Sequence, residues 1–212
     1  MRSLLSVVPP RLPAAPQQYE TRFHDQHSDV LRLYFNQIGG NVNALTGTRG
    51  GQYLNFPYAA IQRTTDKAFV ANTATQITFD ENDFLNGCLN DGTNGITVEQ
   101  SGIYNYQFSA QWKNTDSQIH DAWIWLGING ANVPGTASQF SVPNRHGSVD
   151  GHLIAAANFY VQLTAGQYVE LYAAVNNVAV SLEAYPAQTS PFVMPSIPSV
   201  VATLSFVSSV LP

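Results

Sequence analysis

The stretch that decides the fold is GIYNYQFSAQ, residues 102–111. Its apolar and polar residues alternate, so that Tyr104, Tyr106 and Phe108 fall on one side with polar residues between them. Successive side chains of a β-strand point to opposite faces of the sheet. The alternation therefore predicts a strand with one aromatic face in a core and one polar face turned away from it.

Similar short runs recur on both sides of this stretch, separated by Gly, Asn, Asp and Pro. We expect further strands at residues 59–62, 75–78, 95–98, 121–128, 152–162, 168–174, 179–184 and 199–208. Asn129-Gly130 is typical of a tight hairpin turn, because both residues tolerate positive φ, and Ala165-Gly166 predicts a second hairpin. About eight to ten short strands without a helical pattern between them indicate an all-β sandwich or barrel.

A helical pattern precedes the strands. Residues 17–38 lack Gly and Pro, and apolar residues recur every three or four positions, which predicts an amphipathic helix. One series follows the spacing of a coiled-coil seam: Leu31, Phe35, Ile38, Val42 and Leu45. The helix would either pack on its own domain or form a neck of parallel helices around a threefold axis. Gly39-Gly40 would loosen or end it.

The N-terminus is expected to be an extended arm. Four prolines in residues 1–16 oppose both helix and central strand. The arm is either a flexible tail or a strap that orders on another protein, and the strap is favoured by its apolar side chains, Leu4, Leu5, Val7 and Val8. This apolar run is too short for an export signal. The predicted organisation is an arm at 1–16, a helical neck at 17–46 and a β domain at 47–212.

Composition excludes some classes of function. Charged residues make up 11% of the 212 residues, against about 25% in average soluble domains. A net charge of −5 with scattered basic residues argues against nucleic-acid binding. No apolar run approaches the roughly 20 residues of a membrane-spanning helix, so we expect no membrane insertion. A surface so poor in charge favours an oligomer that buries part of it.

Two polar stretches could carry chemistry. His146, Asp150 and His152 offer zinc-binding atoms, but their spacing matches no standard zinc pattern, and a loop shaped by hydrogen bonds is the alternative. Residues 80–83, DEND, could bind calcium or form a solvated acidic turn. No Ser or Cys lies on a recognisable nucleophile elbow. We therefore predict neither an enzyme nor a cofactor.

The single cysteine and the tryptophans also have simple interpretations. Cys88 cannot form a disulfide within the chain and is expected to be a small buried hydrophobe. Trp112, Trp123 and Trp125 could stack on sugars, or they could fill the space between two sheets or contact other copies in a trimer.

Four motifs together resemble the tumour necrosis factor and complement globular-head superfamily. In order they are ITVEQSGIYNYQFSAQ, WIWLGINGANVP, GHLIAAANFYVQLTAGQYVELYAA and SVVATLSFVSS, and the match covers roughly residues 54–210. The resemblance implies a jelly-roll β-sandwich that packs as a homotrimer. It places four aromatic residues in the core or the trimer contact: Tyr104, Tyr106, Phe108 and Phe206. The sequence departs from the superfamily in having no collagen stalk and no disulfide pair.

A second set of stretches resembles virion proteins of marine tailed phages: RLYFNQI, RGGQYLNFPYAAIQ, SVPNRHGSVDGH and QTSPF followed by PSIPSVVATLSFV. This resemblance implies a structural virion protein, such as a trimeric fibre, knob or capsid decoration, anchored by its arm. The implied partners are other capsid or tail proteins and a host surface glycan. The alternative is a secreted or surface carbohydrate-binding adhesion module.

Overall fold

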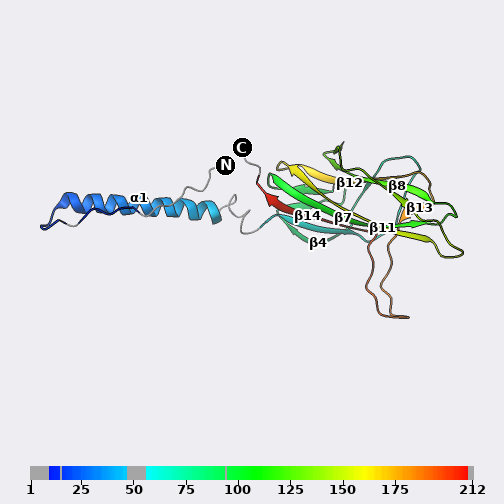
Figure 1. The fold of residues 1–212 in the computed structure, drawn as a ribbon. Helices are drawn as coiled ribbons and strands as arrows, with labels where there is room; N and C mark the ends of the chain where they lie inside the picture. The colour runs from blue at the N-terminus through cyan, green and yellow to red at the C-terminus, as the bar shows by residue number, and fades with distance from the viewer. Residues whose placement is uncertain (1–9, 15, 47–55, 94, 210–212) are drawn as a thin grey trace. The chain divides into compact units, whose positions relative to one another are not determined.

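The computed structural model describes residues 10–14, 16–46, 56–93 and 95–209. The chain divides into two compact units, an N-terminal unit and a unit formed by Pro57–Val210. The N-terminal unit contains a single helix, α1 (Thr21–Thr46), within its described residues, and the second unit consists of two β-sheets (Figure 1).

The β unit is a jelly-roll sandwich, as the sequence predicts. The first sheet, which we call the β7 sheet, has the order β2 (Lys67–Ala68), β13 (Val180–Leu182), β7 (Gly102–Asn114), β14 (Val200–Ser208), β1 (Tyr58–Arg63) and β4 (Glu81–Asn86), with β11 (Gly151–Leu163) paired to β7. The second, the β8 sheet, has the order β10 (Ser138–Val142), β8 (His120–Ile128), β12 (Tyr168–Val175), β6 (Ile96–Val98) and β5 (Cys88–Asn90), with β3 (Thr75–Ile77) on β12 and β9 (Ala131–Asn132) on β8. All of these pairs are antiparallel.

The predicted aromatic core exists and lies within one chain. Tyr104 and Tyr106 are fully buried between the two sheets, and Phe108 is nearly so. Phe206 of β14 meets Tyr104 edge to face, with ring centroids 5.5 Å apart. Cys88 is buried as expected, and this burial, with a smaller contribution from the charge of Glu99, raises the pKa of its thiol to about 12. A thiol with that pKa stays protonated at neutral pH.

One of the two predicted hairpins is confirmed and the other is wrong. Asn129 and Gly130 both have positive φ, 50° and 78°, in the turn between β8 and β9. Ala165-Gly166 is also a turn, but it joins β11, which pairs with β7, to β12, which pairs with β8. The chain crosses from one sheet to the other there. Turn residues define where the chain reverses, not which strand becomes the neighbour.

Five strands, β2, β4, β5, β9 and β10, have no counterpart among the predicted ones. Four are at most five residues long, and β4 begins at Glu81, within the stretch 80–83 for which the sequence offered a calcium site or an acidic turn. β4 pairs with β1 at the end of the β7 sheet, and most of its side chains are exposed. An edge strand needs no apolar alternation, and charge on it discourages pairing with other chains.

The helix ends where the predicted neck ends, at residue 46, but it begins later than residue 17. It begins at Thr21 and continues through Gly39-Gly40 to Thr46. Each glycine costs about 1 kcal/mol of helix stability but keeps its backbone N–H, so the pair does not break the helix. Phe35 and Val42 are exposed, 63% and 48%, and Ile38 is partly buried. The side chain of Leu45 lies outside the described set, and the threefold neck stays a prediction.

Candidate interaction surface

The β7 sheet turns a second face away from the core, and the strand register brings its side chains into rows. Ser109 of β7, for example, lies between Ala156 of β11 and Val201 of β14. We call this surface the outer face. Its residues are Ile103, Asn105, Gln107, Ser109, Gln111 and Lys113 of β7, His152, Ile154, Ala156, Asn158, Tyr160 and Gln162 of β11, Val201, Thr203, Ser205 and Val207 of β14, and Tyr58, Ala60 and Gln62 of β1.

The outer face is nearly free of charge. Among the residues just named, Lys113 is the one Lys, Arg, Asp or Glu, whereas roughly a quarter to a third of an ordinary solvated surface is charged. Large apolar side chains stand on the same face: Ile154 is 62% exposed and Tyr160 is 68% exposed. A low share of charged residues together with exposed aliphatic and aromatic groups is typical of a surface that contacts another protein.

The charge of Lys113 is neutralised within the chain. Its ammonium lies 2.5 Å from Glu183 Oε1 and 3.4 Å from Asp150 Oδ2. Tyr185 donates a hydrogen bond to the other oxygen of Glu183, and His152 Nδ1 lies 3.7 Å from that oxygen. These five side chains come from β7, β11 and the segments beside β11 and β13. They form a compact cluster at one end of the outer face.

The protonation states in this cluster follow from its contacts. The hydrogen bond to Glu183, followed by the charges of Glu183 and Asp150, raises the pKa of Lys113 despite partial burial. Burial, then hydrogen bonding to Glu183, raises the pKa of Tyr185 above its ordinary value. Lys113 therefore stays charged and Tyr185 stays neutral through the physiological pH range. Glu183 and Lys113 lie 70 residues apart in sequence, and no local pattern pairs them.

The weak metal candidates are not gathered into a metal site. Asp150 and His152 both belong to the Lys113 cluster, in which Asp150 faces the Lys113 ammonium and His152 faces Glu183. His146 is exposed and pairs through its backbone with Val149 in a tight turn at Gly147. Across the described part of the chain, no group of three or more His, Cys, Asp or Glu side chains is placed to hold a metal ion. No described helix is long and apolar enough to cross a membrane.

Of the alternatives that the sequence left open for the tryptophans, a place between the two sheets is confirmed for Trp112 and is wrong for Trp123 and Trp125. Trp112 is buried, but Trp123 and Trp125 are only partly buried, and the side chains that alternate with them, Ile124 and Leu126, fill the core instead. Trp123 and Trp125 therefore lie on the outward side of the β8 sheet. Period-two alternation shows that two residues share a face but not which face is buried.

Trp125 stands in a bonded cluster on the β8 sheet. Its ring is 6.0 Å from the ring of Tyr172 with 15° between the planes, and its Nε1 donates to Asn132 at 2.7 Å. Glu170, which is 3% exposed, accepts hydrogen bonds from the Gly130 amide at 2.6 Å and from the Tyr172 hydroxyl at 3.0 Å. The polar groups of this cluster thus form their hydrogen bonds within the chain. The part of the cluster that remains for contact with a ligand is the surface of the Trp125 and Tyr172 rings.

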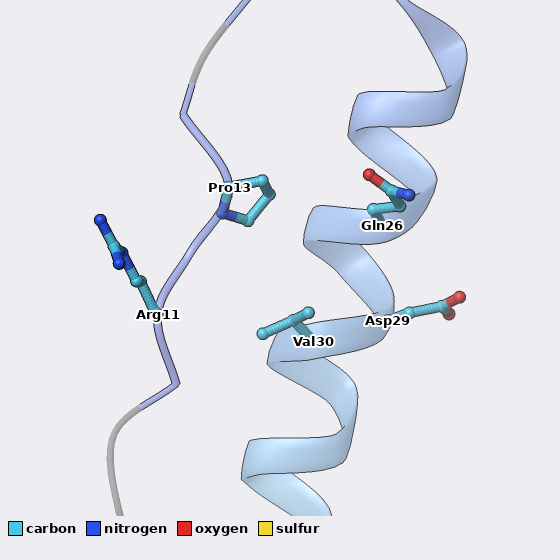
Figure 2. A pocket seen from close by; sticks show the side chains of 5 residues that line it. All are labelled: Arg11, Pro13, Gln26, Asp29 and Val30. Atoms are coloured by element: carbon cyan, nitrogen blue, oxygen red, sulfur yellow. The ribbon is translucent and has the colours of Figure 1, made fainter.

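The four arm residues named from the sequence, Leu4, Leu5, Val7 and Val8, lie outside the described residues. Residues 10–14 run beside α1 without regular structure and form a shallow pocket with it. Figure 2 shows Pro13 turned toward the helix, on the side of Gln26 and Val30, whereas Arg11 points away. Asp29 at the rim is bound by Arg32 at 2.9 Å. These contacts provide no buried polar group for a ligand.

The sequence matches no family model and no curated protein. Among solved structures, the chain is similar to the globular domain of zebrafish complement 1qA protein, at 14% identity, over 73% of this chain and 98% of that chain, with a TM-score of 0.44. This similarity concerns the fold alone. The jelly-roll assignment rests on the strand topology described above.

Proposed function

We propose that this chain is a non-enzymatic head protein that assembles as a homotrimer through the outer face of the β7 sheet. The observation that carries the proposal is that the outer face, with Lys113 as its one Lys, Arg, Asp or Glu, exposes apolar side chains. A subunit contact removes such a face from water, and the buried apolar area stabilises the assembly.

The size of the outer face fits a stable subunit contact. β7 and β11 have 13 residues each, β14 has 9 and β1 has 6. At about 3.3 Å per residue along a strand and about 4.8 Å between strands, these four strands cover roughly 650 Å². Each partner in a specific protein interface of standard size commonly contributes about 600–1,000 Å².

The proposed biological setting is a phage virion. The resemblance of four stretches to virion proteins of marine tailed phages supports it, and the exposed Phe35 and Val42 of α1 are suited to a helical neck. The arm would attach the protein to capsid or tail, and three heads would multiply weak contacts with a host surface.

Particles assembled with a chain lacking residues 1–16 should not carry the protein, although the truncated chain still trimerises. Particles that retain the truncated protein would contradict the anchoring role.

A charge placed in the middle of the outer face should prevent assembly. Ala156 is exposed in the single chain and lies opposite Ser109 near the centre of the face, so Ala156→Arg would bury an unpaired guanidinium in the trimer without disturbing the fold. Analytical ultracentrifugation should give three copies of the 23.1 kDa chain for the wild type and one copy for the variant.

The matched control is Ala131→Arg on β9 of the other sheet, which is also exposed and should remain a trimer. Circular dichroism checks that both variants are folded. A wild-type protein that is a monomer at micromolar concentration contradicts the trimer itself. An Ala156→Arg variant that stays trimeric contradicts only the assigned face.

One observation favours a second candidate function, a carbohydrate-binding adhesion module. The outward Trp125 and Tyr172 rings lie nearly parallel on neighbouring strands, and sugars stack on flat aromatic surfaces. Binding of the wild type to a glycan array, lost in Trp125→Ala and kept in Trp112→Phe, would establish this function. Absence of glycan binding by the intact trimer excludes it for the sugars on the array.

A further inference from the structure

A hairpin projects from the β unit between β13 and β14. We call residues 186–198 the hairpin arm. It is held by backbone hydrogen bonds between Tyr185 and Ile197, both 2.8 Å, and between Gln188 and Met194, at 3.0 and 2.9 Å. Figure 1 shows it extending beyond the layer that contains β14, β7 and β11, on the side away from β12 and β8. The hairpin arm therefore projects on the side of the outer face.

The base of the hairpin arm is held to the β7 sheet by side-chain and backbone bonds. At its base, Glu183 is bound by Lys113 of β7, and Tyr185 donates to Glu183. The Glu183 amide also donates to the Gln111 carbonyl at 3.0 Å, and the Ala184 amide donates to Asp66 Oδ1 at 2.8 Å. These bonds tie the base to the β7 sheet on both sides, so the Lys113 cluster sets the direction of the hairpin arm.

The tip of the hairpin arm is left uncovered by the described residues of its own chain. Its sequence, PAQTSPFVMPSIP, contains no charged residue. At its tip Phe192 is 59% exposed and Val193 is 83% exposed. An isolated two-stranded hairpin is at best marginally stable in water, and exposed apolar groups gathered at a tip mark a contact with another surface.

The surface with matching chemistry is the outer face of another copy. The residues that define each surface include no Asp or Glu, although Glu183 and Asp150 pair with Lys113 at one end of the outer face. Both surfaces carry exposed aliphatic and aromatic groups, with Ile154 and Tyr160 on the outer face. A charged partner would leave its charges unpaired against either surface. When a projection on one copy binds a complementary surface on the next copy, the contact is head to tail. Such contacts close into a ring when the rotation that relates neighbouring copies divides a full turn into equal parts. From Tyr185 to the tip, six residues at about 3.3 Å reach roughly 20 Å, the width of about four strands.

We infer that the hairpin arm clasps a second copy of this chain, with Phe192 and Val193 seated on the neighbour's outer face. Each copy in the ring gives one arm and receives one. This inference rests on the proposed homotrimer and adds a contact that the sandwich alone does not supply.

The first test measures trimer dissociation on dilution by mass photometry. The variant Phe192→Ser/Val193→Ser removes apolar groups that are exposed in the single chain, so its fold should be intact. Its dissociation concentration should rise roughly a hundredfold or more, because each trimer loses three buried Phe and three buried Val side chains. The matched control is Val149→Ser/Val178→Ser, two other exposed valines, at 65% and 68%, and it should dissociate like the wild type.

The second test locates the tip. A benzophenone amino acid replaces Phe192 in trimers mixed from ¹⁴N and ¹⁵N copies, and mass spectrometry reads the crosslinked peptides. The inference requires both the weaker trimer and mixed-isotope crosslinks to peptides of β7, β11 or β14. A wild-type trimer whose tip variant dissociates normally, or whose crosslinks join only peptides of one isotope, overturns the clasp and leaves the trimer standing. A monomeric wild type overturns the proposed trimer and the clasp together.

Discussion

Gly151→Ala is expected to lower the free energy of unfolding by about 3 kcal/mol, the upper part of the range for overpacked cores. Gly151 begins β11, opposite Asn114 of β7, and a Cβ there would lie 1.8 Å from the Pro143 carbonyl oxygen and 2.6 Å from its carbon. The obstacle is backbone, which cannot rotate away as a side chain can. The chain must shift where the loop before β11 joins the β7 sheet.

Urea unfolding followed by tryptophan fluorescence measures this loss. The control is Gly147→Ala in the same loop, where nothing lies within 4 Å of the added Cβ but φ is +63°. Strain in that left-handed conformation costs only about 1–2 kcal/mol. A Gly151→Ala variant that loses no more stability than Gly147→Ala would contradict the expected effect of the close approach of Pro143.

Trp112→Ala should cost about 3–5 kcal/mol of folding stability, as expected when a large aromatic side chain is deleted from a core. Trp112 is 1% exposed, and its ring packs on Phe69 with centroids 5.5 Å apart. The deletion leaves a cavity between the two sheets that rigid strands cannot close. Thermal and urea unfolding of the purified variant give the magnitude.

Trp112→Phe separates packing from hydrogen bonding at the same position. The indole Nε1 of Trp112 is buried and has no hydrogen-bond partner among the described residues. Phenylalanine keeps an aromatic ring against Phe69 and removes the unpaired N–H, whose burial costs about 1–3 kcal/mol. We expect the change in stability to stay within about 1 kcal/mol of the wild type. A loss as large as that of Trp112→Ala would show that the full indole volume is required.

The candidate surface and the hairpin arm were beyond prediction from the sequence, for a definable reason. Local alternation shows that Asn105, Gln107 and Ser109 share a side of one strand. It does not show that β11 and β14 flank β7, or that their outward residues extend the same uncharged face. Long-range pairing of this kind depends on which strands meet, and the strands that meet lie tens of residues apart.

The sequence by itself determined the strand at residues 102–111, its buried aromatic face and the turn at Asn129-Gly130, because these depend on a local period and on the φ that single residues tolerate. Only the tertiary structure decided that Trp123 and Trp125 face outward and that Lys113 meets Glu183 at the base of a projecting hairpin. Between residues 102 and 111 one face is polar, which leaves the aromatic face to be buried, but around Trp123 and Trp125 both faces are apolar, and there the second sheet selects the one that is buried.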